Sequence, residues 1–468
     1  MNLNLAMPWG DECSPPQTPF LSFYSPQSDN MMFGSEKDVE IICQAGLRSI
    51  KLGWTLHRNM VRKPFLTGEA EPLIANKYRI KIPTKDLIPG FYDLRVTLDT
   101  GIQNKESDKY KRRPVAGVCT FGWSVEKMAV TDTRPADFKK FWDDAREALA
   151  KIPLDAKEGP MQVFGPKEIN EYNVTGACLP PDYDPAGHRA ESVESCKVDF
   201  AGPDGGRVYG WLAKPEGKGP FPAMLVLPGA GFAARPRPLE QARHGYVSLD
   251  IQIHGQEVDL KEYPKLPGYY SDFKFEPVSA YYYYLVHLRC LQAVNYLLSR
   301  PDVDPRRIVL VGGSQGGRLG IVVAGLDSRI SAVVSCIANS PNQPHLRWVY
   351  RCNGYAELGD LKPDPNIELA DGMDLKGAPQ PGANPDAKCF PYYDPMNYAQ
   401  DIKCPVMMLA GLTDPVSPPY SVWAVYNRLG TSSRIIVPVA GHGHDWSAEF
   451  DRSAWRWLDS IFSKNSIR

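Results

Sequence analysis

The most informative motif in this 468-residue sequence is a serine set among glycines, Gly312-Gly313-Ser314-Gln315-Gly316. A β-branched run, Ile308–Val311, precedes the motif, and a helix-like stretch follows it. This strand–turn–helix context is that of the G-x-S-x-G nucleophile elbow, where glycines leave room for the adjoining strand and helix. The elbow also puts the serine at a helix N-terminus, whose N–H groups favour negative charge. We therefore predict that Ser314 is the nucleophile of an ester-cleaving hydrolase and that the N–H of Gln315 stabilises an oxyanion.

A serine hydroxyl is a poor nucleophile without a base, and in this fold the acid and then the histidine follow the serine. We predict the acid at Asp414, which follows the apolar run Val406–Ala410. The other nearby carboxylate, Asp401, precedes that run and would therefore lie at the opposite end of the sheet. The alternative role for Asp414 is a turn or helix-capping residue.

Two histidines, His442 and His444, follow the last apolar run of the chain, Ile435–Val439. We predict His442 as the base, because it comes directly after the run in a glycine-flanked turn that could bring the imidazole over the sheet. His444 is the alternative base, or a residue that supports the site from its turn.

An oxyanion hole needs a second donor, which usually comes from the loop after an early strand. The loop PGAGF predicts the N–H of Ala230 as that donor, with the flanking glycines allowing close approach; an ordinary glycine-rich turn is the alternative. The next apolar run leads into His254-Gly255-Gln256. His254 and Gln256 are candidates to touch the substrate or to brace the site, and a structural role for His254 is an equal alternative.

From about residue 195 onward, apolar runs of strand length alternate with helical patterns. Strands are predicted at 223–227, 247–253, 308–311, 332–337, 406–410 and 435–439, and helices at about 279–299, 316–326, 419–429 and 447–463. Near-continuous apolar strands are typical of a sheet covered on both faces, and this alternation is typical of α/β proteins. We predict a doubly wound, mostly parallel α/β-hydrolase sheet in a domain at 126–468, with an insertion rich in proline, glycine and aromatic residues at about 341–400.

The sequence before this domain has a different pattern. Residues 1–30 are rich in proline and polar residues without periodicity, and they predict an irregular leader. Between residues 31 and 125, short β-prone runs are separated by turn sequences, which predicts a small all-β sandwich of the immunoglobulin-like kind as an accessory domain. A helix with one apolar face is predicted at about 137–152, near the start of the second domain.

Composition narrows the classes of function. The net charge of −1 gives no overall attraction to nucleic acid or to an anionic membrane. The ten cysteines form no C-x-x-C pair, which predicts buried free thiols rather than a metal site and leaves one or two disulfides open. No segment is long and apolar enough to cross a membrane, and the first residues lack a secretory signal, so export would need a different start codon. The predicted chemistry needs no cofactor or metal.

Several segments, in order, resemble the acetyl xylan esterase and cephalosporin C deacetylase group, family seven of the carbohydrate esterases. They are RPADFKKFWDDAREALAKIP, DGGRVYGWLAKPEGKGPFPAMLVLPG, GGSQGG, CFPYYDPMNYAQDIKCPV and GLTDPVSPPYSVWAVYNRLG. The resemblance covers about residues 135–465. It implies removal of acetyl groups from an acetylated carbohydrate of the xylan or xylo-oligosaccharide type. It also implies Ser314, Asp414 and His442 as the triad, with the N–H groups of Gln315 and Ala230 as the oxyanion hole.

The sequence departs from the group's pattern in three places. Ala230 stands where the group usually has tyrosine, His254 stands where it has arginine, and Gly443 follows His442 where a glutamate usually follows the histidine. These departures affect the sugar pocket more than the chemistry. Compact members of the group form closed oligomers, and the extra N-terminal domain leaves homo-oligomerisation open here. The alternative functions are another esterase (glucuronoyl or general) or a peptidase of the same fold, or a catalytically dead carbohydrate-binding protein.

Overall fold

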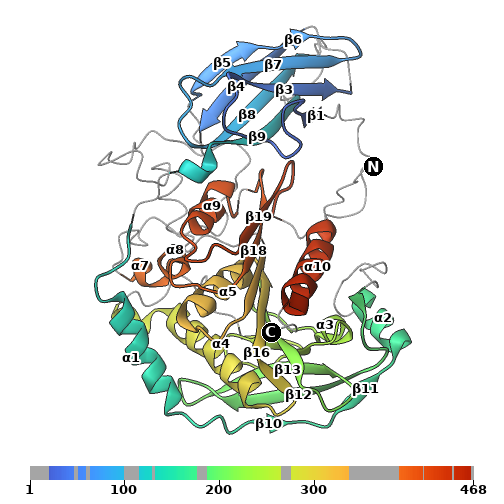
Figure 1. Cartoon of the computed structure of the whole chain (residues 1–468), viewed down its shortest axis with the longest axis vertical. Coiled ribbons are helices and arrows are strands. Elements are labelled where there is room, and N and C mark those ends of the chain that lie inside the picture. The colour runs from blue at the N-terminus through green and yellow to red at the C-terminus, as the bar shows by residue number, and fades with distance from the viewer. Residues whose placement is uncertain are drawn as a thin grey trace.

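The structure is a computed structural model that describes residues 21–46, 51–58, 64–99, 115–128, 132–175, 187–264, 276–336, 389–414, 416–444 and 447–464. Figure 1 shows a β-rich N-terminal region at one end of the molecule and a larger α/β region at the other. The predicted fold class, a mostly parallel α/β sheet preceded by an all-β region, is confirmed.

The N-terminal region contains two β-sheets. One has the order β1-β3-β7-β6 and is antiparallel throughout. The other has the order β2-β9-β8-β4-β5 and is antiparallel except for the short parallel pair β2 and β9. The strands are β1 (Leu21–Tyr24), β2 (Met32–Phe33), β3 (Asp38–Ala45), β4 (Lys51–Arg58), β5 (Leu66–Glu69), β6 (Glu71–Pro72), β7 (Lys77–Pro83), β8 (Gly90–Asp99) and β9 (Val115–Trp123). Alternate residues of β7, Tyr78, Ile80 and Ile82, are buried, as expected for a strand with one face on the core.

We propose an immunoglobulin-like topology for this region. The strand orders β1-β3-β7-β6 and β9-β8-β4-β5 correspond to the A-B-E-D and G-F-C-C′ sheets of such sandwiches. The Tyr92 hydroxyl in β8 donates to the carbonyl of Ile88 at 2.9 Å and accepts from its N–H at 3.0 Å. This is the arrangement of the tyrosine corner at the start of strand F. Cys43 and Cys119 are free thiols, so no disulfide joins these two buried residues.

The predicted irregular leader is wrong where it reaches β1, because Leu21–Tyr24 pairs with β3 along its whole length. Four residues are too few to show a periodic pattern, and it is the partner strand that makes this segment extended. Residues 1–20, the rest of the predicted leader apart from 25–30, lie outside the described part of the chain.

The two regions meet at helix α9 (Pro419–Asn427). The ring of Phe91 in β8 packs edge-on against Trp423, with centroids 5.1 Å apart. The side-chain amide of Asn427 donates to the carbonyl of Val125 at 2.8 Å. Apolar contact and a directional hydrogen bond therefore join the β-region to one helix of the larger region.

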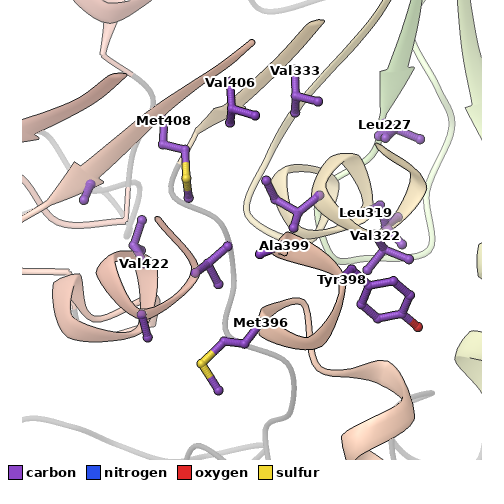
Figure 2. Close-up of a cluster of buried hydrophobic side chains, with 14 of the residues drawn as sticks. Leu227, Leu319, Val322, Val333, Met396, Tyr398, Ala399, Val406, Met408 and Val422 are labelled. Carbon is purple, nitrogen blue, oxygen red and sulfur yellow. The ribbon is translucent and has the colours of Figure 1, made fainter. Parts of the chain in front are cut away.

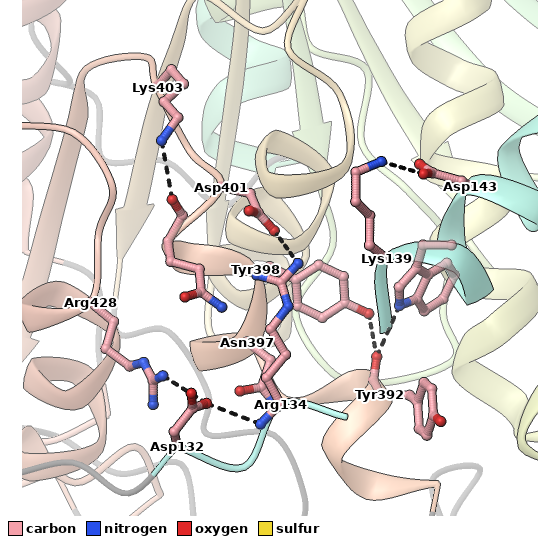
Figure 3. Close-up of polar contacts among 12 residues, drawn as sticks. Asp132, Arg134, Lys139, Asp143, Tyr392, Asn397, Tyr398, Asp401, Lys403 and Arg428 are labelled. Carbon is pink, nitrogen blue, oxygen red and sulfur yellow. Dashed lines mark hydrogen bonds and ion pairs between the residues drawn. The ribbon is translucent and has the colours of Figure 1, made fainter. Parts of the chain in front are cut away.

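Ion pairs hold the segment that leads into the α/β region (Figure 3). Asp132 pairs with Arg428 at 2.9 Å, and Arg134 pairs with Asp401 at 2.7 Å. The Arg134 guanidinium also lies over the ring of Phe138, 4.4 Å from its centroid, at the first residue of α1 (Phe138–Ala150). These contacts fix where the predicted first helix begins.

The central sheet has the order β10-β12-β13-β15-β14-β16-β17-β18-β19, with β11 also paired to β12. Strand β13 is antiparallel to both neighbours, and every pair from β15 to β19 is parallel. The strands are β10 (Lys157–Glu158), β11 (Gln162–Phe164), β12 (Val193–Ala201), β13 (Arg207–Pro215), β14 (Phe221–Leu227), β15 (Val247–Gln252), β16 (Val303–Gly313), β17 (Ala332–Cys336), β18 (Val406–Gly411) and β19 (Arg434–Val439). The helices are α2 (Pro166–Thr175), α3 (Leu239–Arg243), α4 (Tyr282–Ser299), α5 (Gln315–Leu326), α7 (Phe390–Tyr393), α8 (Met396–Ala399) and α10 (Ala448–Lys464), besides α1 and α9.

Both faces of the central sheet are covered by apolar side chains. Leu225 and Leu310 join the core that contains α4 and α5, whereas their neighbours Met224 and Val309 join the core that contains α10. Figure 2 shows part of the first layer, where Val333 of the sheet lies near α5. Burial on both faces explains why these strands appear in the sequence as continuous apolar runs.

The predicted strands and helices of the α/β region are confirmed with shifts of a few residues at their ends. The hairpin β12–β13 lies outside the predicted strands, because its strands mix buried and partly exposed residues instead of forming continuous apolar runs. Most of the predicted insertion at 341–400 lies outside the described residues, and its end forms α7 and α8. The seven cysteines that the structure describes are free thiols. None of the described helices has the length and hydropathy to cross a membrane.

Candidate active site

Ser314 lies at a tight turn between β16 and α5. Its backbone, at φ 55° and ψ −120°, is in a strained conformation for a residue with a side chain, at a cost of roughly 1–3 kcal/mol. The Ser314 N–H donates to the carbonyl of Cys336 on β17 at 2.9 Å, which fixes the turn. A Cβ at Gly316 would clash with the Leu227 carbonyl, and one at Gly312 would lie 2.5 Å from the backbone of Gly316. The glycines of the motif are therefore required by close packing.

The imidazole beside Ser314 belongs to His444. Its Nε2 lies 2.9 Å from Ser314 Oγ, and its Nδ1 lies 2.8 Å from Asp414 Oδ2. A carboxylate only accepts hydrogen bonds, so Nδ1 donates to Asp414 and Nε2 accepts from the serine hydroxyl. The prediction that His442 would occupy this place is wrong, and the alternative residue, His444, occupies it.

The backbone of His442 explains the error. Its carbonyl accepts hydrogen bonds from the N–H and the hydroxyl of Thr413, at 3.0 and 2.8 Å. Gly411, at the end of β18, lets this turn approach, since a Cβ there would lie 2.7 Å from the His442 carbonyl oxygen. The turn after β19 is thus first fixed to the loop that carries the acid, and the imidazole that reaches Ser314 comes two residues later.

Asp414 is almost completely buried, with 1% of its surface exposed. Its Oδ1 accepts from the N–H groups of Val416 and Ser417 at 2.7 and 2.8 Å, which leaves Oδ2 for His444. Two backbone donors stabilise the carboxylate and fix its orientation. Asp401, the carboxylate that the sequence order argued against, instead pairs with Arg134.

The side chain of Gln315 connects the elbow to the loop that contains Ala230. Its Nε2 donates to the carbonyl of Gly229 at 3.2 Å, and its Oε1 accepts from the Tyr283 hydroxyl at 2.7 Å. The amide is buried, so these bonds are shielded from water. These bonds hold the two segments together, as the predicted oxyanion hole would require. That the N–H groups of Gln315 and Ala230 face a common oxyanion stays a prediction.

His254 holds the same loop through a hydrogen bond to the backbone of Gly231. Its Nε2 lies 2.9 Å from the carbonyl oxygen of Gly231, and its Nδ1 lies 2.6 Å from the Tyr282 hydroxyl. Because a carbonyl only accepts, Nε2 carries the proton and Nδ1 accepts from the tyrosine. Burial lowers the pKa of His254 to about 4, which keeps the imidazole neutral near pH 7. These contacts fit the predicted role of His254 in supporting the site. Gln256 is half-buried beyond the end of β15 and stays a candidate for substrate contact.

A buried ion pair holds the far end of this loop. The Arg235 guanidinium donates two parallel hydrogen bonds to the carboxylate of Asp250 in β15, at 2.7 and 3.0 Å. The Gln252 amide donates to the carbonyl of Ala233 at 2.8 Å. With His254 and Gln315, these contacts fix the loop at several points, which is the preorganisation that an oxyanion hole requires.

Sequence reasoning missed two residues of the site. Tyr283 and Arg235 act through partners that are distant in sequence, and no local pattern identifies such pairs. The sequence did contain a sign that His444 is the base. His444 is followed by an acidic residue, Asp445, much as the histidine of the family's motif is followed by glutamate, whereas His442 is followed by glycine.

Residues 161–460 match the family described as acetyl xylan esterase (AXE1). The chain belongs to the acetyl xylan esterase family. It is therefore a carboxylic ester hydrolase, and the matched segment begins after the N-terminal β-region and includes all three residues of the hydrogen-bonded chain.

Comparison with individual proteins agrees with this assignment. This acetyl xylan esterase family member is 27% identical to the acetyl esterase Axe7A of Xylanibacter ruminicola over 381 residues, which is 78% of this chain and 74% of that one. It resembles the solved acetyl xylan esterase from Paenibacillus sp. R4 with a TM-score of 0.53 and 24% identity, covering 72% of this chain and 98% of that one. For acetyl xylan esterase 1 from Thermoanaerobacterium sp. JW/SL YS485 the TM-score is 0.52 at 20% identity, covering 71% of this chain and 96% of that one. The two structural likenesses show the shared fold.

Proposed function

We propose that this protein is a serine esterase that removes acetyl groups from acetylated carbohydrate of the xylan or xylo-oligosaccharide type. The observation that carries the proposal is the hydrogen-bonded chain Ser314–His444–Asp414 at the strand ends of an acetyl xylan esterase family fold. The substrate class comes from the names of the relatives, which are called acetyl esterase and acetyl xylan esterase.

In the proposed mechanism, Nε2 of His444 takes the proton of the Ser314 hydroxyl as Oγ attacks the ester carbonyl. Asp414 holds the imidazole in the required tautomer and stabilises the imidazolium that forms. The N–H groups of Gln315 and Ala230 would stabilise the negative charge that develops on the carbonyl oxygen. His444 then gives its proton to the sugar oxygen as its bond to the carbonyl carbon breaks, so that the sugar leaves as an alcohol, and water hydrolyses the acetyl-enzyme by the same steps.

Acetate release from acetylated xylo-oligosaccharides tests the proposal. Ser314→Ala should lower turnover by several orders of magnitude and abolish labelling by a fluorophosphonate probe. Ser299→Ala, an exposed serine at the end of α4, is the matched control and should keep wild-type turnover. Near-normal turnover in Ser314→Ala would contradict the nucleophile assignment.

The substrate class is tested separately with acyl esters of increasing length, a glucuronoyl ester and a peptide amide. Acetyl esters should be cleaved fastest. Faster cleavage of a glucuronoyl ester, longer ester or amide, lost in Ser314→Ala, would refute the acetyl preference and retain the serine mechanism. A wild-type chain that no fluorophosphonate labels would indicate an inactive, carbohydrate-binding protein instead.

A further inference from the structure

A second cluster of chemistry-bearing side chains lies beside α3, which follows the loop of Ala230 in the chain. Within the described part of the chain, His188, Glu240 and His244 form a group of three residues of metal-ligand type, and one ligand atom from each lies within 4.8 Å of the others. Figure 1 shows α3 between α2 and α10, on the opposite side of the sheet from α4. None of these three side chains takes part in the proposed ester hydrolysis.

The two oxygens of Glu240 have different surroundings. Oε1 is in contact with Nε2 of His188 and lies 3.5 Å from Nε2 of His244. Oε2 accepts from the side-chain amide of Asn173 at 2.7 Å and lies 3.7 Å from the Arg243 guanidinium. Both imidazoles therefore point at one carboxylate oxygen while other groups hold the second oxygen. Metal-binding carboxylates and histidines are typically oriented by such outer partners.

His244 provides an independent observation. Its side chain is 3% exposed, and its Nε2 has no hydrogen-bond partner although it is buried. The imidazole stacks on Trp455 of α10, with ring centroids 3.9 Å apart and planes at 2°, and a Cβ at Gly187 would clash with the ring. Rigid packing thus holds a buried imidazole nitrogen toward Glu240 at 3.5 Å, too far for a well-formed hydrogen bond. Buried polar atoms of this kind call for a ligand or another explanation.

We propose that His188, Glu240 and His244 bind a divalent cation of the zinc class. Two imidazole nitrogens and one carboxylate oxygen are a known zinc donor set, with water in the fourth position. The charge of Glu240 offsets part of the charge of the cation, and the nearby Arg243 lies on the Oε2 side and donates to Asn170 at 2.8 Å. The cation would join the segment at 187–190 to α3, at a site separate from the Ser314–His444–Asp414 chain.

Zinc content and thermal stability of the full-length protein test this proposal. After incubation with micromolar zinc and gel filtration, the wild-type chain should retain about one equivalent, and saturating zinc should raise its melting temperature by about 4 °C. The variants His188→Gln and Glu240→Gln should retain none and show no zinc-dependent shift. Cys404→Ser, which removes a partly exposed thiol, is the control for zinc bound by cysteine and should behave as wild type.

A second readout covers variants that fold poorly. Cobalt(II) bound to the wild-type protein should give visible absorption bands of a tetrahedral site without a thiolate charge-transfer band, and zinc should displace it. A wild-type chain that retains no zinc and gives no cobalt spectrum would overturn the proposal. So would equal zinc retention in the wild type and in both ligand variants. Either result would leave the esterase proposal untouched, because ester hydrolysis by Ser314 is measured independently.

Discussion

Replacing the two histidines of the 442–444 turn one at a time tests which of them is the base. His444→Ala removes the imidazole that lies 2.9 Å from Ser314 Oγ and 2.8 Å from Asp414 Oδ2. Among the residues that the structure describes, the serine then has no base within hydrogen-bonding distance, while Asp414 keeps its two backbone donors and the fold should persist. Loss of the triad histidine lowers kcat by roughly 10⁶-fold in subtilisin, so we expect a loss of about 10⁴- to 10⁶-fold here, equivalent to about 5–8 kcal/mol in the barrier.

His442→Ala is the matched control. The backbone carbonyl of His442 accepts two hydrogen bonds from Thr413, and alanine retains that carbonyl. We therefore expect kcat to stay within about 10-fold of the wild-type value, because the Ser314–His444–Asp414 chain stays in place. Hydrolysis of p-nitrophenyl acetate gives kcat and KM, fluorophosphonate labelling reports the reactivity of Ser314, and melting temperatures show that both variants fold.

The opposite ranking would refute the reasoning. If His442→Ala were the more damaged variant, the imidazole of His442 would have to replace that of His444 in the working enzyme. If His444→Ala kept more than about 1% of wild-type kcat, a triad role would be excluded, since the loss would fall below about 3 kcal/mol.

Three further changes follow from the same geometry. Gln315→Leu removes the bond to Gly229 and should lower kcat about 10- to 100-fold with little change in KM, a loss typical of a weakened oxyanion hole; an unchanged kcat would contradict the positioning role. Gly316→Ala forces a Cβ onto the Leu227 carbonyl and should destabilise the fold by about 1–3 kcal/mol in urea unfolding, whereas Gly53→Ala, which meets no atom within 4 Å, should change stability little. The pKa of His254 is about 4 in the folded protein, so the unfolded chain binds a proton that the folded protein does not bind between pH 6.5 and 4. The contribution of His254 to the free energy of unfolding is therefore complete above pH 6.5 and falls by about 3 kcal/mol as the pH drops to 4. His254→Gln should flatten that part of the pH dependence of unfolding, and an unchanged slope would exclude a neutral buried histidine.

The elbow, the acid and most of the central sheet could be predicted because each depends on a local rule. The glycines around Ser314 report a steric requirement at that turn, and the buried strands show themselves as apolar runs because both of their faces are covered. The acid could be chosen because its position after β18, rather than before it, decides which end of the sheet it occupies.

The base could not be chosen by the same reasoning. His442 and His444 both follow β19, and the distance from the strand does not reveal which carbonyl Thr413 will bind. The hydroxyl and the N–H of Thr413 both donate to the backbone carbonyl of residue 442, which every residue type has, so the identity of residue 442 gives no sign of these bonds. The bond between Tyr283 and Gln315 is hidden for a related reason, since it depends on how α4 packs against α5.

Helix α9 lies between the N-terminal β-region and the loop that orients Asp414. The backbone donors that orient Asp414 belong to Val416 and Ser417, in the loop that runs directly into α9. The same helix packs on the β-region through Trp423 and Phe91. One helix thus contacts the β-region on one side and follows the loop that orients Asp414 on the other.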